Sequence, residues 1–357
     1  MKAILLDGFG GAENMRLRDV DMPRPGAGQI LIKVAATSVN RPDVIQRQGN
    51  YPPPKGESEI LGLEAAGTVE AVGDGVTGWQ VGDRVLALLA GGGYAEYAVA
   101  QADHAMPVPA GMDFSRAACV CETYLTAYLN LFLLAGVGGG AAAVAIPGLG
   151  GGDAANTKTD PAARQTVLIH GGSGGIGTAA IQLCRALADA QIIATASNAN
   201  LERVAALGAD RVSDYRREDF AERVREVTNN RGADVILDHI GGPYLQSNMR
   251  ALAVGGTLML IGVLGGAKAE LNLAQAMVKR QRIIGSVLRS RPRAQKAALI
   301  AKFAETVLPL FAAGGDGRDA QIAPLIAAEF PLAQAAEAHR AMESGGHFGK
   351  IVLRVQG

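Results

Sequence analysis

The feature that most constrains the fold is a run of glycines between a short apolar strand and an amphipathic helix. The run reads GGSGGIG over residues 171–177 and directly follows the apolar stretch 167–170. Apolar residues then recur at helical spacing, at Ile176, Ala180, Leu183 and Leu187. A strand, a glycine turn and a helix in this order predict a βαβ unit, and hence a parallel sheet.

Two chemical motifs overlap in this loop, and a purely structural glycine turn is a third interpretation. Gly172, Gly174 and Gly177 form the GxGxxG fingerprint of dinucleotide sites, in which the backbone approaches a pyrophosphate at a helix N-terminus. The same residues spell GxSxG, the nucleophile elbow of hydrolases, and Ser173, Asp238 and His339 follow in triad order. The dense glycines, and the lack of an HGGG-type segment before them, favour the dinucleotide interpretation.

The rhythm of the chain predicts two kinds of domain within its 357 residues. The first 120 residues alternate short β-branched runs with glycine and proline turns, which is typical of a small β-rich domain. From residue 166 apolar strands alternate with helices, as expected for a parallel sheet. After residue 283 the pattern is mixed and ends on an apolar strand over 350–354.

Composition excludes several partners and locations. Lys and Arg total 34, as do Asp and Glu, so zero net charge argues against nucleic acid as the main partner. Three cysteines without a CxxC pair, and an acidic residue at Asp7, favour a reducing, cytoplasmic location without a signal peptide. The uncharged stretch 123–152 lacks basic flanks and contains Pro147, so we expect a buried helix over 124–134 and a surface excursion over 138–164, with no membrane span.

A series of motifs in order resembles the zinc-independent quinone oxidoreductases of the medium-chain dehydrogenase/reductase superfamily. Within that family, the closest resemblance is to the NADPH:quinone oxidoreductases induced by a tumour suppressor in mammals. The segments that carry it are MKAI (1–4), VNRPD (39–43), RQGNY (47–51), GLE (62–64), VGDRV (81–85), YLTAY (124–128), the glycine loop, DHIGG (238–242), LRSR (288–291) and GKIVL (349–353).

The resemblance implies an α/β fold in which a doubly wound Rossmann sheet is inserted into a β-rich, GroES-like catalytic domain. We therefore expect residues 1–122 and 286–357 to form the catalytic domain around an NADPH-binding domain over 123–285. It also implies NADPH as cofactor, a small-molecule quinone as substrate and a homodimer. The glycine- and alanine-rich segment 138–164 departs from the family pattern.

Zinc-dependent relatives carry a cysteine ligand near Asn40 and a histidine ligand where this chain has Leu63. A catalytic zinc needs three protein ligands, so we expect no metal. Without a Lewis acid, alcohol–ketone exchange loses its polarising group, which favours quinone or activated-alkene reduction.

The resemblance also implies roles for individual residues. Tyr51 and Asn40 are the predicted catalytic residues, with Tyr51 in the substrate pocket. Glu64 is either a general acid or, as the preferred hypothesis, the buried partner of a basic residue; Arg289 and Arg291 either contact the dimer or cofactor region or lie on a solvated face. The predicted cofactor contacts are Asn40, Thr126, Gly172, Ser173, Gly174, Gly175, Ile176, Gly177, Ser197, Tyr215, Arg216, Gly241, Gly262, Leu264, Leu288 and Lys350.

NADPH is preferred over NADH because the second strand of the unit ends in Ser197-Asn198 with no carboxylate. A carboxylate there would bind the ribose hydroxyls and repel a 2′-phosphate. Tyr215 and Arg216 are the candidate phosphate contacts, with Arg203 as a further basic group. Two alternatives to quinone reduction stay open: a 2-enoyl or alkenal double-bond reductase, and a mainly non-catalytic NADPH-binding protein.

Overall fold

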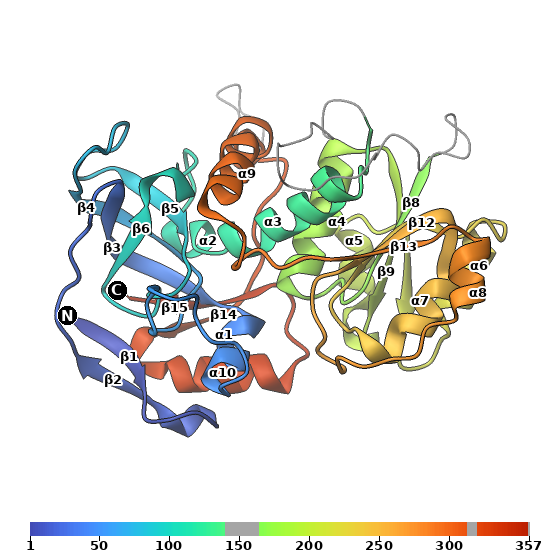
Figure 1. The fold of residues 1–357 in the computed structure, drawn as a ribbon, viewed down its shortest axis with the longest axis horizontal. Helices are drawn as coiled ribbons and strands as arrows, with labels where there is room; N and C mark the ends of the chain where they lie inside the picture. Colours follow the sequence, from blue (N-terminus) through green and yellow to red (C-terminus); the bar gives the residue numbers. More distant parts are fainter. Residues whose placement is uncertain (140–163, 313–319, 356–357) are drawn as a thin grey trace. The chain divides into compact units, whose positions relative to one another are not determined.

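The computed structural model describes residues 1–139, 164–312 and 320–355 of the chain. It divides into two compact units, one formed by Met1–Leu125 with Pro292–Gly357 and the other by Thr126–Arg291 (Figure 1). The boundaries expected from the sequence, after residues 122 and 285, lie a few residues earlier. Most of the glycine- and alanine-rich segment 138–164 lies outside the described residues.

The second unit is built on a six-stranded, all-parallel sheet in the order β10-β9-β8-β11-β12-β13. The chain runs outward from β8 through β9 to β10, returns to β11 beside β8, and then runs outward the other way. This is the strand order of a dinucleotide-binding domain. The strands are β8 (Gln165–Ile169), β9 (Ala190–Ala196), β10 (Arg211–Asp214), β11 (Ala233–Asp238), β12 (Leu252–Leu260) and β13 (Arg282–Gly285).

Helices link these parallel strands, because a parallel connection must cross over one face of the sheet. A buried apolar cluster joins strands β8, β9, β11 and β12 to helices α6 and α7, and includes Leu168, Ile236, Val224 and Met249. The helical segments are α4 (Gly175–Leu187), η6 (Asn198–Asn200), α5 (Leu201–Ala206), α6 (Phe220–Val227), η7 (Gly242–Tyr244), α7 (Leu245–Ala251) and α8 (Leu273–Val278).

The first unit contains a mostly antiparallel sheet in the order β14-β15-β3-β4-β5-β7, with β6 also paired to β3 and a separate β1-β2 hairpin. Here β15 pairs parallel with β14 and antiparallel with β3, so the C-terminal strand completes the N-terminal sheet. The strands are β1 (Lys2–Leu6), β2 (Met15–Asp19), β3 (Gln29–Val39), β4 (Glu64–Val72), β5 (Arg84–Leu88), β6 (Tyr97–Gln101), β7 (Ala105–Pro107), β14 (Ile326–Pro331) and β15 (Lys350–Arg354).

Helical segments of three to 14 residues complete this unit. They are η1 (Ala12–Asn14), α1 (Arg41–Arg47), η2 (Ala102–His104), α2 (Phe114–Ala117), α9 (Arg293–Thr306), η8 (Leu308–Phe311), η9 (Leu332–Gln334) and α10 (Ala335–Ser344). Helix α1 begins after Asn40, whose backbone N–H donates to Asp43 Oδ2 at 2.8 Å, so Asp43 satisfies a donor at the helix start.

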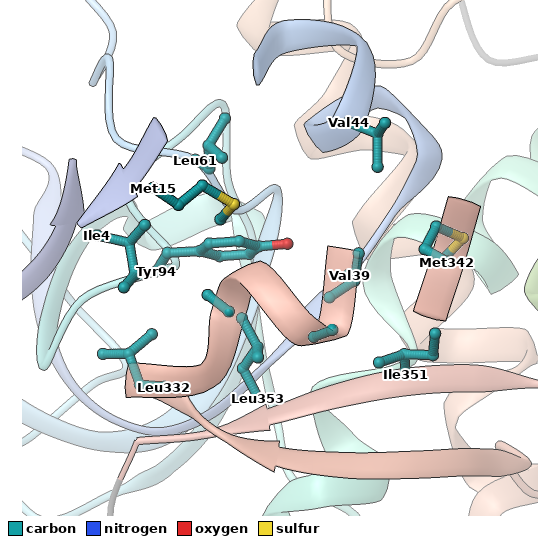
Figure 2. Close-up of a cluster of buried hydrophobic side chains, with 12 residues drawn as sticks. Ile4, Met15, Val39, Val44, Leu61, Tyr94, Leu332, Met342, Ile351 and Leu353 are labelled. Carbon is teal, nitrogen blue, oxygen red and sulfur yellow. The ribbon is translucent and has the colours of Figure 1, made fainter. Parts of the chain in front are cut away.

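One apolar cluster unites the two ends of the chain. Ile4, Leu61 and Tyr94 from the N-terminal part pack with Leu332 and Ile351 from the C-terminal part, and Figure 2 shows the Tyr94 ring among these side chains. The Tyr94 hydroxyl lies 3.0 Å from His339 Nε2 and donates to Asp43 Oδ2 at 3.4 Å, so this buried hydroxyl has polar partners inside the cluster. The predicted fold class, a Rossmann sheet inserted in a split β-rich domain, is confirmed.

The described part of the uncharged stretch is a buried helix, as expected. Helix α3 (Cys121–Tyr128) continues into a π-helix, η3 (Leu129–Leu134), in which all six residues are buried. In the described parts of the chain, no helix is long and apolar enough to cross a membrane.

Candidate active site and cofactor-binding residues

The topology of the second unit selects one edge of its sheet as the binding site. Strands β8 and β11 are neighbours, and the chain leaves them in opposite directions along the sheet. Ligands of open α/β sheets bind at the carboxyl ends of the strands at such a switch point. The glycine loop follows β8 and the segment Asp238–Gly242 follows β11, so both predicted loops lie at this point.

Three glycines of the loop differ in what a side chain would meet at their positions. Gly171 has φ +59°, and a Cβ on Gly177 would lie 2.2 Å from the carbonyl oxygen of Gly171, so neither position accepts a side chain easily. At Gly174 the nearest atom to a Cβ would be 3.4 Å away. The chain's own packing therefore does not require glycine at 174, whereas a phosphate that approaches the backbone would.

The helix that follows supplies donors for an anion. Helix α4 has 13 residues and begins at Gly175, and its first turn leaves N–H groups without intrahelical partners. The positive end of the helix dipole lies at the same terminus. Ser173, Gly175 and Ile176 thus form the junction of loop and helix, and the loop fits the pyrophosphate of a dinucleotide.

The hydrolase interpretation is not supported by the structure. A nucleophile elbow holds its serine in a strained turn. Among the described residues, the non-glycine positions with positive φ are Asn229, Asn230 and Arg280, so Ser173 is not strained in this way. His339 is fully buried in the first unit and bonded to Tyr94, whereas Asp238 belongs to the second unit and accepts from Asn248.

The loops after β11 and β12 form the second part of this edge. Asp238 Oδ1 accepts from the N–H of Ile240 at 2.6 Å, and Gly241 has φ +83°. Burial raises the pKa of Asp238 to about 6. The N–H of Leu264 donates to the carbonyl oxygen of His239, and a Cβ on Gly262 would lie 3.2 Å from that oxygen, so the two loops lie against each other.

The ends of β9 and β10 carry the residues expected near a ribose. Ser197 follows β9 and precedes η6, and the adjacent strand β10 ends at the buried Asp214. Tyr215 is 40% exposed, with the Arg216 guanidinium carbon 5.7 Å from its ring centroid. Asp214 Oδ1 accepts from the backbone N–H of Arg216, so this carboxylate is partly engaged by its own turn.

In the first unit a buried polar cluster surrounds Asn40. Lys350 Nζ donates to Asn40 Oδ1 and lies 3.0 Å from Glu64 Oε1. Asn40 Nδ2 donates to the same Glu64 oxygen at 3.0 Å, and Ser38 Oγ also donates to it. Glu64 Oε2 accepts from the N–H of Glu122 at 2.8 Å. The preferred hypothesis for Glu64, a buried partner of a basic residue, is confirmed.

Strand register explains this convergence. Ile351 of β15 lies opposite Val39 of β3, so Lys350 and Asn40 come together at the same end of that pair. Glu64 begins β4, which is the next strand beside β3. Three strand ends thus bring a cation, an amide and a carboxylate into one buried group.

The remaining predicted residues differ in their burial. Tyr51 is half-buried shortly after α1, Thr126 is buried in α3, and Leu288 is buried after β13. Arg289 is also buried, so it does not belong to a solvated face. Across residues 1–139, 164–312 and 320–355, no group of three His, Cys, Asp or Glu side chains could hold a metal ion.

Sequence reasoning missed three hydrogen-bond partners, two of Glu64 and one of the glycine loop. Ser38 and Glu122 bind Glu64, and Thr195 Oγ1 accepts from the N–H of Gly171. Ser38 is close to Asn40 in sequence and Thr195 is near the end of a predicted strand, which are weak signals. The partner of Glu122 is a backbone group, for which the sequence carries no signal.

Comparison with known proteins agrees with this architecture. Residues 26–110 match the alcohol dehydrogenase GroES-like domain, and residues 175–305 match the family described as zinc-binding dehydrogenase. Quinone oxidoreductases from Lama guanicoe and Homo sapiens are 32% and 31% identical to the chain, covering 99% of it and 97% of each relative.

Solved structures give the same result. A mycobacterial quinone oxidoreductase has a TM-score of 0.77 at 30% identity, covering 99% of this chain and all of its own. A mycobacterial protein complexed with NADPH has the same TM-score at 29% identity and the same coverage. With its confirmed fold and full-length relatives, the chain belongs to the quinone oxidoreductase family of the medium-chain dehydrogenase/reductase superfamily.

Proposed function

We propose that this oxidoreductase reduces quinones with NADPH and without a metal ion. The observation that carries the proposal is the glycine loop at the switch point of a parallel sheet, in a chain whose full-length relatives are named quinone oxidoreductases. When bound, the nicotinamide supplies a hydride, and the protein's task is to bind and orient the reactants. A quinone is already a good acceptor, so it needs less polarisation than a simple ketone.

Individual residues divide this task. Backbone groups of Gly172–Gly177 would bind the pyrophosphate, with Gly241 at the neighbouring loop. Asn40, Thr126, Gly262, Leu264 and Leu288 are proposed to border the nicotinamide half. Lys350 would act in this part of the site by holding the Asn40 amide, since its ammonium donates to Asn40 Oδ1.

The buried ammonium of Lys350 also supports metal independence. Asn40 and Leu63 stand where zinc-dependent relatives have ligands, and a fixed positive charge lies beside Asn40. A divalent cation placed there would be repelled, because like charges interact strongly where water is excluded. The cluster already has its cation in Lys350.

We also propose a homodimer in the cytoplasm. Apolar side chains along α8 and around β13 are exposed, including Met277 at 73% and Val278 at 71%, and β13 is the last strand of its sheet. A large exposed apolar patch marks an interaction surface. Light scattering should give twice the chain mass, and a monomer at micromolar concentration would exclude the dimer.

The cytoplasmic location, supported by three free cysteines, is tested by cell fractionation.

Substrate class is tested by following NADPH oxidation with an ortho-quinone and, separately, with a 2-enal. We expect turnover of the quinone, unchanged by a chelator, because no step needs a metal. Preferred turnover of the enal would identify a double-bond reductase. NADPH binding without turnover of either compound would identify a non-catalytic protein. Ester hydrolysis that is lost in Ser173→Ala would restore the hydrolase hypothesis.

Tyr51 is predicted to act on the substrate rather than the cofactor. Tyr51→Phe should raise the KM for the quinone or lower kcat modestly, because only the hydroxyl is lost. The Kd for NADPH should stay within about threefold, which is less than 1 kcal/mol. Tyr97→Phe, a half-buried tyrosine on β6, is the control. Equal loss of NADPH affinity in Tyr51→Phe would contradict the substrate role.

NADPH should bind at least about tenfold more tightly than NADH, because a charge-assisted contact to the 2′-phosphate contributes roughly 1.5–3 kcal/mol. Tyr215→Phe and Arg216→Ala should reduce this ratio, measured as Kd values at fixed salt. Arg217→Ala is the matched control, since this neighbour lies 3.8 Å from Asp214 and is well exposed. Equal affinities in the wild type would overturn the cofactor preference. An unchanged ratio in both variants would overturn only the residues.

Lys350→Met should lower the free energy of unfolding by about 3–5 kcal/mol, because it leaves the buried Glu64 carboxylate without its cation. Lys302→Met is the matched control: it breaks a pair with Glu305 of the same 3.0 Å length at an exposed site, and should cost less than about 1 kcal/mol. Urea unfolding measures both. Similar losses in the two variants would contradict the role assigned to the buried pair, and Glu64→Gln added to Lys350→Met should restore part of the stability.

A further inference from the structure

Four buried polar side chains lie at the carboxyl ends of the strands of the second unit or contact them. The proposed function gives none of these side chains a role. They are Thr195 near the end of β9, His170 directly after β8, Asn248 in α7 and Asp238 at the end of β11. None is more than 1% exposed. Buried polar groups form their hydrogen bonds within the protein, so the partners of these four side chains show which atoms donate and which accept.

The donors in this group can be assigned in order, starting from the carboxylate. Asp238 Oδ2 accepts from Asn248 Nδ2 at 3.0 Å, which turns the Asn248 carbonyl oxygen toward His170. Asn248 Oδ1 lies 2.7 Å from His170 Nε2, and because this oxygen can only accept, Nε2 must carry the hydrogen.

The tautomer of His170 then determines the donors and acceptors of the remaining hydrogen bonds. Burial lowers the pKa of His170 to about 3, so the ring is neutral near pH 7 and its Nδ1 can only accept. Thr195 Oγ1 lies 3.1 Å from Nδ1 and donates its hydrogen there. The same oxygen accepts from the N–H of Gly171 at 3.1 Å. All the hydrogen bonds therefore run in one direction, from Gly171 to Asp238.

Aromatic packing holds the histidine in place. The ring of His170 meets the rings of Phe220 and Tyr244 edge-on, at centroid distances of 4.7 and 4.8 Å. These contacts exclude water from the ring and restrict its rotation. The imidazole is thus a rigid link between a threonine on one side and an asparagine on the other.

The first and last groups of this series of hydrogen bonds, Gly171 and Asp238, belong to the two loops at the switch point. Gly171 opens the glycine loop, and its N–H donates to Thr195 Oγ1. Asp238 accepts from the N–H groups of Ile240 and Gly241 in the other loop. The relative position of these loops determines where their remaining backbone donors point.

We propose that Thr195, His170 and Asn248 form a buried hydrogen-bond relay that positions the two cofactor-binding loops relative to each other. This inference rests on the proposed function of those loops. The three are positioning residues, since they act through the backbone of Gly171 and Gly241. A single reversed donor would leave two like groups facing each other, so the relay works in only one tautomer of His170.

The tautomer can be observed directly by ¹⁵N NMR of the imidazole nitrogens in the full chain at pH 7.5. The protein has five histidines, and a His170→Gln variant assigns the signal. We expect a neutral ring with hydrogen on Nε2. A ring protonated on Nδ1, or on both nitrogens, would overturn the relay.

The positioning role is tested by Thr195→Val, which keeps the shape and removes the hydroxyl. The Gly171 amide should exchange hydrogen faster, and the Kd for NADPH should rise about five- to tenfold, as for loss of one or two hydrogen bonds. Thr195→Ser should restore both values. Thr257→Val is the matched control, a fully buried threonine of the same sheet whose hydroxyl serves Arg282.

The outcomes separate the relay from the proposed function. Equal Kd values and equal exchange in Thr195→Val and Thr257→Val would overturn the positioning role. If the wild type fails to bind NADPH, the proposed function fails, and the inferred cofactor positioning fails with it. In that case the tautomer and the Gly171 exchange still decide whether the relay itself exists.

Discussion

The antiparallel pairing of β15 with β3 is the constraint on which the first unit depends. It joins residues more than 300 positions apart in sequence and places the C-terminal strand between β14 and β3. The apolar cluster around Tyr94 is shared by both ends of the chain as a consequence. The pairing also determines the register that puts Lys350 beside Asn40, so the sheet and the polar cluster are parts of one arrangement.

Each unit buries one carboxylate at its site, and the two carboxylates have different kinds of partner. In the first, the buried Glu64 carboxylate is neutralised by an ammonium and further bonded by Ser38, Asn40 and a backbone N–H. In the second, the buried Asp238 accepts hydrogen bonds from the Asn248 amide and from the backbone N–H groups of Ile240 and Gly241. Burial disfavours the charged form of a carboxyl group, and this effect raises the pKa of Asp238.

The sequence predicted what depends on neighbouring residues. The strand predicted over 350–354 has the bounds that the structure gives it, because a short apolar run after a glycine carries a local signal. The glycine loop was located for the same reason. The link of Lys350 to Asn40 and Glu64 could not be derived from residues alone, because it depends on a strand register set by the folded sheet. Asn248 lies in the interior of a helix with no local pattern that indicates its partners.

The overlap of two motifs in one loop shows why a pattern of residue types underdetermines chemistry. The two motifs use residue 173 differently. In a dinucleotide site the backbone of this residue approaches the pyrophosphate, whereas in a nucleophile elbow its side chain is the nucleophile and the turn is strained. The backbone at Ser173 does not have positive φ, and the residue of the loop with φ +59° is Gly171, which as a glycine adopts this conformation without strain. The Gly171 N–H donates to Thr195 Oγ1. The loop is therefore shaped around its backbone donors, which is the requirement of an anion site.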